Sequence, residues 1–200
     1  MSLLCSIATF ALATSVTPGP NNLMLMASGV NFGFKRSIPH ATGITIGFLI
    51  MLLSVGFGLN ALFKSVPQIY PLMKVLGFGY LLYLSWRVAT SDALPARAAP
   101  GEAQARPLGF LGAAAFQWVN PKAWMIAVSF SSNYLPQSAG ALFVVLCCVV
   151  VAAVNFPSIA IWLWMGTRLE NALRDPRKRQ VFNWLMAALL IASMLPVLWF

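Results

Sequence analysis

Long stretches of uncharged, mostly apolar residues alternate along this chain with short segments that carry Lys and Arg. Six long stretches contain no Asp, Glu, Lys or Arg: residues 1–34, 37–63, 75–86, 107–121, 123–167 and 180–200. A helix needs about 20 mainly apolar residues to cross the hydrocarbon core of a bilayer. The pattern therefore predicts an all-α polytopic membrane protein.

The stretch 123–167 is too long for one span, and it contains a run of turn-forming residues at 131–138, Ser-Ser-Asn-Tyr-Leu-Pro-Gln-Ser. Dividing it there gives six transmembrane helices in a single domain, residues 1–200. We expect the spans near residues 3–27, 41–63, 70–89, 108–131, 139–165 and 181–199.

The basic residues predict the orientation of these spans. Ten of the 13 Lys and Arg residues lie in odd-numbered loops, which places those loops in the cytoplasm and both termini in the periplasm of an inner-membrane protein. The net charge of +9 would suggest a nucleic-acid partner in a soluble protein. Here the charges lie in short loops beside apolar spans, so we expect the lipid bilayer as partner and no nucleic acid.

Residues 91–106 are rich in Ala, Pro and Arg and predict a cytoplasmic linker between two halves, about 1–90 and 107–200. Each half then holds three spans. Because three is odd, two similar halves would be inverted relative to each other, as in many secondary transporters.

The first span is interrupted by helix-breaking and polar residues: Thr17, Pro18, Gly19, Pro20, Asn21 and Asn22. Unpaired backbone groups in lipid cost several kcal/mol each, so such a break survives only where protein or a water-filled cavity satisfies it. Proline suits the first turn of a helix, so a new half-helix should begin at Pro20.

The fourth span has a matching break at Asn120, Pro121 and Lys122, with Asn as a strong N-cap and Pro in the next position. Breaks in corresponding spans of two halves point to a transport site; a tolerated proline kink is the alternative. Lys122 has no acid within a span to pair with. It could contact carbonyl groups, extend to the membrane edge, or bind a substrate carboxylate.

Together, two half-helix N-termini and a lysine would bind an anionic group, while Asn side chains and free carbonyls could bind an ammonium. That is the polarity of a zwitterionic amino acid. Elsewhere, four glycines are expected to let helices approach closely: Gly43, Gly47, Gly77 and Gly79. His40, near the cytoplasmic end of span two, has either an interfacial role or that of a proton relay.

Several motifs in order resemble the LysE/RhtB superfamily of amino-acid exporters over the whole chain. They are residues 17–22 (TPGPNN), 43–47 (GITIG), 72–84 (LMKVLGFGYLLYL), and 120–123 (NPKA) with a Pro136-Gln137 turn. The resemblance implies a six-span inner-membrane exporter of amino acids or their derivatives that uses the proton-motive force. With residues 47–50 and 86–91, the chain is most similar to the cysteine/O-acetylserine exporter branch, and a small neutral substrate is expected.

Other classes of function fit the sequence less well. The spans contain no acid, no HExxH motif and one histidine, so we expect neither an enzyme nor a metal or cofactor site. A passive channel or a structural membrane subunit remains the alternative, and saturable, energy-dependent flux would separate it from a transporter. A homodimer is plausible, and the sequence does not identify an interface.

Overall fold

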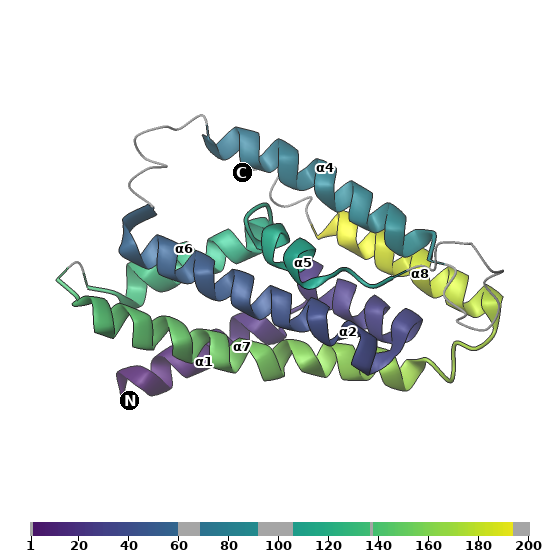
Figure 1. The fold of residues 1–200 in the computed structure, drawn as a ribbon, viewed down its shortest axis with the longest axis horizontal. Helices are drawn as coiled ribbons and strands as arrows, with labels where there is room; N and C mark the ends of the chain where they lie inside the picture. The colour runs from purple at the N-terminus through teal and green to yellow at the C-terminus, as the bar shows by residue number, and fades with distance from the viewer. Residues whose placement is uncertain (1, 60–68, 92–105, 137, 194–200) are drawn as a thin grey trace.

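The structure is a computed structural model that describes residues 2–59, 69–91, 106–136 and 138–193 (Figure 1). Every regular element in this part of the chain is helical. The elements are α1 (Leu3–Val16), α2 (Pro20–Ser54), the π-helical segment η1 (Val55–Leu59), α4 (Ile69–Ala89), α5 (Phe110–Gln117), α6 (Pro121–Tyr134), α7 (Ala141–Leu169) and α8 (Pro176–Ala192).

The long element α2 is a helical hairpin that reverses at Gly33. Gly33 has φ 76°, a left-handed conformation that glycine adopts without a steric penalty. The hydroxyl oxygens of Ser28 and Ser37 lie 2.7 Å apart, whereas nine residues of straight helix would separate them by about 13 Å. The expected connection over residues 28–40 is therefore wrong: a single glycine makes the turn, and helix continues on both sides of it.

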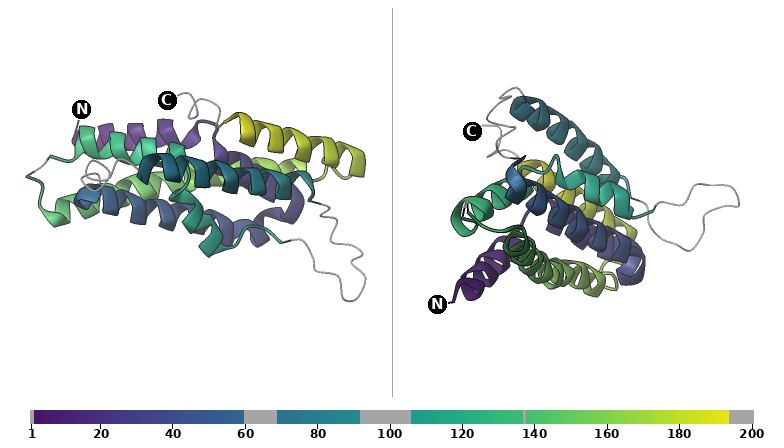
Figure 2. Two further views of the ribbon diagram at one scale, coloured as in Figure 1. Left: turned by 90° about the horizontal axis from the view of Figure 1, so that it is seen from above. Right: turned by 60° about the vertical axis from the view of Figure 1, so that its left-hand side comes forward.

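The helices lie side by side along one common direction (Figures 1 and 2). The hairpin turn of α2, the end of α4 and the α7–α8 connection lie at one end, which we call the basic end. The opposite end carries the N-terminus, the end of η1 and the α6–α7 connection. The basic end takes its name from the Lys and Arg residues of its turns and helix ends: Lys35, Arg36, Arg87, Arg168, Arg174, Arg177, Lys178 and Arg179.

The helix α2 lies at the centre of the packing. All three buried apolar clusters contain its residues, including Leu23, Leu25 and Phe48. α2 and α7 cross closely because Gly29 faces the backbone of Leu163 and Thr167, where a Cβ atom would overlap. This crossing was not predicted from the sequence.

The glycines expected to serve helix packing behave in two ways. A Cβ atom at Gly43 or Gly47 would overlap the backbone of α5, and one at Gly77 would overlap the carbonyl of Val119. Gly79 is exposed, and a Cβ there would meet no atom within 4 Å. The structure therefore gives close helix contacts at three of the four positions and none at Gly79.

The outer surface of the bundle is apolar. Val75, Leu111 and Leu142 are 71%, 79% and 72% exposed. Among the described residues, two helical stretches contain an apolar window long enough to cross a membrane: Pro20–Leu59, which includes the reversal at Gly33, and Ala141–Leu169. Leu3–Val16 is apolar but shorter. A surface of this kind is suited to lipid, since soluble monomers rarely expose large apolar patches.

The last helix begins earlier than expected. α8 starts at Pro176, with the Asp175 carboxylate accepting from the backbone N–H groups of Arg177 and Lys178 at 2.8 and 3.1 Å. Arg179, expected in a loop, is buried in this first turn, and its Nε donates to the carbonyl of Leu173 at 3.0 Å.

The expected linker lies almost entirely outside the described residues, as does the expected end of span six beyond residue 193.

Candidate functional site

Two helices begin at the expected breaks. α1 ends at Val16 and α2 begins at Pro20 with Gly19 as its N-cap. α5 ends at Gln117 and α6 begins at Pro121. The side chain of Asn120 accepts from the N–H of Lys122 at 3.1 Å, the N-cap bond that the sequence predicts.

The two breaks lie together and are joined by a pair of amides. The Nδ2 of Asn21 donates to Oε1 of Gln117 at 2.8 Å, and Nε2 of Gln117 donates back to Oδ1 of Asn21 at 3.1 Å. Gln117 is fully buried. Asn21 was among the residues predicted from the sequence and Gln117 was not; the available signal was a glutamine in an apolar run, three residues before the Asn-Pro pair.

Lys122 crosses from the second break to the first. Its Nζ donates to the Thr17 carbonyl at 2.6 Å, the Thr17 hydroxyl at 2.9 Å and the Pro18 carbonyl at 3.2 Å. An ammonium has three donors, so these contacts use all of them. Among the described residues no carboxylate pairs with Lys122. Of the alternatives left open by the sequence, the structure therefore shows contact with carbonyl groups.

Gly19 makes room for this contact. A Cβ atom at Gly19 would lie 2.7 Å from Cδ of Lys122 and 3.0 Å from its Nζ. The φ of Gly19 is −176°, extended backbone that any residue adopts. The glycine thus leaves room for the lysine side chain in this position, and its own backbone conformation does not call for glycine.

Asn22 is part of the break itself. Its Nδ2 donates to the carbonyls of Ser15 and Thr17, both at 2.8 Å, and the residue is buried. These bonds satisfy carbonyls at the end of α1 that have no partner within the helix. Both hydrogens of the amide are therefore used within the protein, which leaves no Asn22 donor for a ligand in this state.

A small cavity of about 30 Å³, the break cavity, lies between the two breaks. Its lining includes Asn22 and Lys122 of the breaks and Asn155 of α7, whose Nδ2 donates to the Ser15 hydroxyl at 3.0 Å. Neither Asn155 nor Ser15 was predicted from the sequence, because the two lie 140 residues apart along the chain. The cavity has room for about one water molecule and not for an amino acid.

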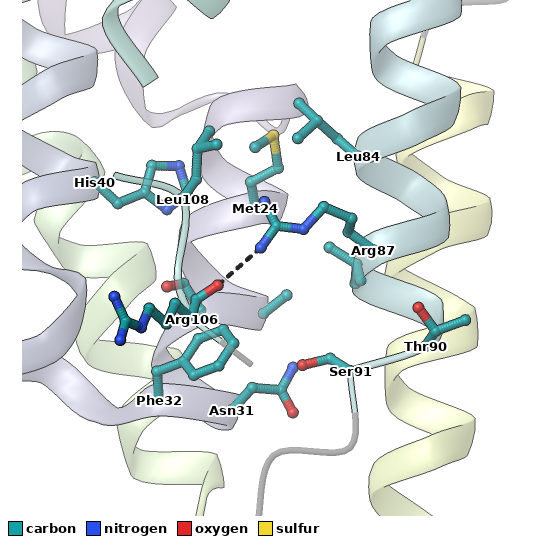
Figure 3. Close-up of a pocket in the computed structure, with 13 residues that line it drawn as sticks. Met24, Asn31, Phe32, His40, Leu84, Arg87, Thr90, Ser91, Arg106 and Leu108 are labelled. Atoms are coloured by element: carbon teal, nitrogen blue, oxygen red, sulfur yellow. Dashed lines mark hydrogen bonds between the residues drawn. The ribbon is translucent and has the colours of Figure 1, made fainter. Parts of the chain in front are cut away.

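A larger cavity of about 230 Å³, the basic-end cavity, lies between the α2 hairpin, the end of α4 and the segment leading into α5 (Figure 3). His40 lines it and is 2% exposed, and neither of its ring nitrogens has a hydrogen-bond partner in the described structure. The structure thus separates His40 from the residues of the breaks. The histidine lies in a different cavity.

Comparison with known proteins matches the chain to one family over nearly its whole length. The family of LysE type translocators matches residues 12–195. The cysteine/O-acetylserine efflux protein of Salmonella typhimurium (strain LT2) is 31% identical over 191 residues, covering 94% of each chain. The protein of the same name from Escherichia coli (strain K12) is 31% identical over 196 residues, 95% of this chain and 94% of the relative. No solved structure gives a significant match.

Proposed function

We propose that this chain, which belongs to the LysE family of translocators, exports a small neutral amino acid or amino-acid derivative across the inner membrane through the site at its two helix breaks. The names of its relatives support amino-acid export as the general activity. Cysteine and O-acetylserine, which those names contain, are both small zwitterions without a charged side chain.

The contact of Lys122 with the first break is the observation that carries the proposal. In this state the ammonium donates to the carbonyls of Thr17 and Pro18. A zwitterion placed between them would satisfy both sides: its carboxylate would bind Lys122, and its ammonium would take the place of the Lys122 ammonium at the two carbonyls. The lysine would then bind an anion instead of neutral carbonyls, so that both partners of the hydrogen bond are ionised.

The N-termini of two helices near Lys122 also favour a carboxylate. The first turns of α2 and α6 begin at Pro20 and Pro121 beside the break cavity. Helix N-termini present N–H groups without intrahelical partners and a partial positive charge, both of which favour a carboxylate. The break cavity is too small for an amino acid, so Lys122 has to leave the Thr17 and Pro18 carbonyls before substrate binds there.

The directions of these helices support a 3+3 inverted repeat with six spans. From the paired breaks, α2 runs toward the basic end and α6 runs toward the opposite end (Figure 1). Two half-helices that start at one level and point in opposite directions are the arrangement found in inverted-repeat transporters. The six spans are α1 with the first segment of α2, the second segment of α2 with η1, α4, α5 with α6, α7, and α8. We place the basic end in the cytoplasm and both termini outside.

The proposal also includes a source of energy for export. We assign it to the proton-motive force, with His40 as the proton-carrying candidate because its buried ring nitrogens are unpartnered in the described structure. A passive channel is the competing function. It would show flux that neither saturates nor depends on an energised membrane.

Everted membrane vesicles test the proposal, because their outer surface is the cytoplasmic face. Uptake of labelled L-cysteine, O-acetyl-L-serine, L-serine and L-lysine is measured in energised vesicles with and without an uncoupler. We expect saturable, uncoupler-sensitive uptake of one or more neutral compounds. Lys122→Met should lower this uptake about tenfold or more, through loss of a charge-assisted contact.

The matched control is Lys178→Met, which removes one positive charge from an exposed position at the basic end. It should keep uptake within about twofold of wild type, since surface charges contribute little. If the Lys122→Met variant took up substrate at the wild-type rate, the helix breaks would not be part of the transport site. Uptake that is linear in concentration and unaffected by uncoupler would show that the protein acts as a passive channel and not as an energised transporter.

A further inference from the structure

The basic-end cavity is large enough for a small amino acid. Its volume of about 230 Å³ corresponds to roughly eight water molecules at about 30 Å³ each. Cysteine has a comparable number of heavy atoms. The break cavity, at about 30 Å³, is closed to such a molecule in the same structure.

Polar groups without partners line one part of this cavity. His40 and Ser91 are 2% and 8% exposed, and neither the histidine nitrogens nor the serine Oγ has a hydrogen-bond partner in the described structure. Buried polar atoms are nearly always paired, and each exception calls for a ligand, a water or a functional reason. Both side chains are donors when a suitable acceptor is present.

A guanidinium adds positive charge. Arg87 extends from α4 across the cavity, and its Nη2 donates to the Arg106 carbonyl at 3.0 Å (Figure 3). That bond uses one of the five guanidinium N–H donors. Among the described residues that line the cavity there is no Asp or Glu. An acceptor with negative charge is therefore the missing partner, and a guanidinium matches a carboxylate with two parallel hydrogen bonds.

Part of the remaining lining is apolar. Met24, Leu84 and Leu108 suit a small uncharged side chain. Met24 follows Asn22 by two residues on the same helical segment, and Asn22 lines the break cavity. Met24 and Asn22 are therefore about 3 Å apart along the helix axis but on different faces of the helix. The larger cavity extends further toward the basic end, because Asn31 and Phe32 beside the hairpin turn also line it.

We propose that the basic-end cavity is a first binding site for the exported molecule, in which Arg87 binds its carboxylate and His40 and Ser91 complete the polar contacts. From there the molecule passes along α2 to the break cavity. This inference rests on the proposed function and deepens it, because it divides binding from translocation between two places in the fold.

The test measures uptake of O-acetyl-L-serine by everted vesicles. Two quantities are compared between wild type and variants: the concentration for half-maximal uptake and the maximal rate. Arg87→Gln should raise the concentration for half-maximal uptake about tenfold or more and leave the maximal rate within about twofold. Arg168→Gln is the matched control: it removes one arginine from the same end, where the side chain is exposed and its guanidinium lies 4.9 Å from the Trp164 ring centre. It should leave half-saturation unchanged.

A second measurement uses equilibrium dialysis of the purified full chain, with labelled O-acetyl-L-serine and its methyl ester, which lacks the carboxylate. Arg87→Gln should weaken binding of the acid and leave that of the ester unchanged. Lys122→Met should retain binding of the acid at the basic-end cavity while uptake is lost. Equal affinity of wild type and Arg87→Gln for the acid would overturn the inference.

The outcomes separate this inference from the proposed function. If wild-type vesicles take up the probe and Arg87→Gln has wild-type half-saturation, the assignment of the cavity alone fails. If wild-type vesicles take up none of the amino acids, the proposed function fails and the inference falls with it. An Arg87→Gln defect that disappears in proteoliposomes of phosphatidylcholine alone would assign the cavity to an anionic lipid headgroup and overturn the inference.

Discussion

At the scale of single residues, the main question is how a lysine is accommodated between two helix breaks. An ammonium away from water is costly unless its donors are satisfied. Here the backbone supplies the acceptors, because the break leaves the carbonyls of Thr17 and Pro18 without helical partners, and Lys122 donates to both. The break and the lysine therefore stabilise each other. Without the lysine the Pro18 carbonyl loses this donor, while the Thr17 carbonyl keeps the amide of Asn22.

Gly19→Ala tests this contact without removing a charge. The new Cβ would lie 2.7 Å from Cδ of Lys122, so the lysine has to move and its hydrogen bonds weaken. We expect a loss of about 1–2 kcal/mol of stability, measured by thermal unfolding in detergent, and a severalfold lower rate of uptake. Gly109→Ala is the control, because a Cβ there meets no atom within 4 Å.

A double-mutant cycle makes the test specific. In a Lys122→Met background, Gly19→Ala should cost less than in the wild-type background, because the charged contact is already absent. Equal effects in both backgrounds would show that the alanine acts through something other than the lysine.

Residue types with strong local effects were the predictable part of the site. Pro20, Pro121 and Asn120 are located correctly at the helix starts, because proline and an N-cap asparagine act within one turn. Gln117 and Asn155 could not be located in this way. Their partners Asn21 and Ser15 lie 96 and 140 residues away along the chain, and only the folded bundle brings them together.

At the scale of elements, glycine determines how closely helices approach. α4 packs on the second break at Gly77, where a Cβ would overlap the carbonyl of Val119. Two residues later, Gly79 faces open space on the exposed side of the same helix. The pair shows why a glycine pattern alone could not predict packing: the pattern does not tell which glycine faces a backbone.

Alanine substitutions at these two positions should have opposite effects. Gly77→Ala should destabilise the fold by about 1–3 kcal/mol, because a backbone carbonyl cannot move away as a side chain can. Gly79→Ala should be neutral or stabilising by about 0.5–1 kcal/mol, since alanine is the better helix former. Thermal unfolding midpoints of the two variants in one detergent measure the difference. A midpoint for Gly77→Ala at or above that of Gly79→Ala would contradict the packing described.

The turn of the α2 hairpin is the place where the structure predicted from the sequence was wrong. Residues 28–40 contain Gly33, Lys35, Arg36 and Pro39, which together indicate a loop. In the structure one positive φ at Gly33 makes the whole turn, and the following charged residues are exposed on the helix. Local composition identified where the chain reverses but not how few residues it needs.

At the scale of the whole molecule, the described helices form one bundle with most of its basic residues at one end. This arrangement predicts which end of the bundle faces the cytoplasm, and that orientation can be measured. Ser2→Cys, in a Cys5→Ser background, places a thiol at the end opposite the basic residues. Lys35→Cys in the same background places one at the basic end. The remaining cysteines, Cys147 and Cys148, are buried.

A membrane-impermeant maleimide should label Ser2→Cys in right-side-out vesicles and Lys35→Cys only in everted ones, because the Lys and Arg of short loops remain in the cytoplasm. Permeabilised vesicles, in which both thiols react, serve as control. The reverse pattern of labelling would invert the orientation and place the basic-end cavity outside.

The lysine between the breaks also has an electrical consequence. If the cargo is a zwitterion, as proposed above, the loaded and the empty site carry the same single positive charge on Lys122. A charge that crosses the whole field gains or loses about 2.3 kcal/mol per 100 mV. A voltage that is negative inside therefore opposes the outward half of each cycle and assists the return by an equal amount. Voltage would change which half-step is slow, but it could perform no net work on the cargo, and accumulation outside would require a second ion whose charge is not carried back.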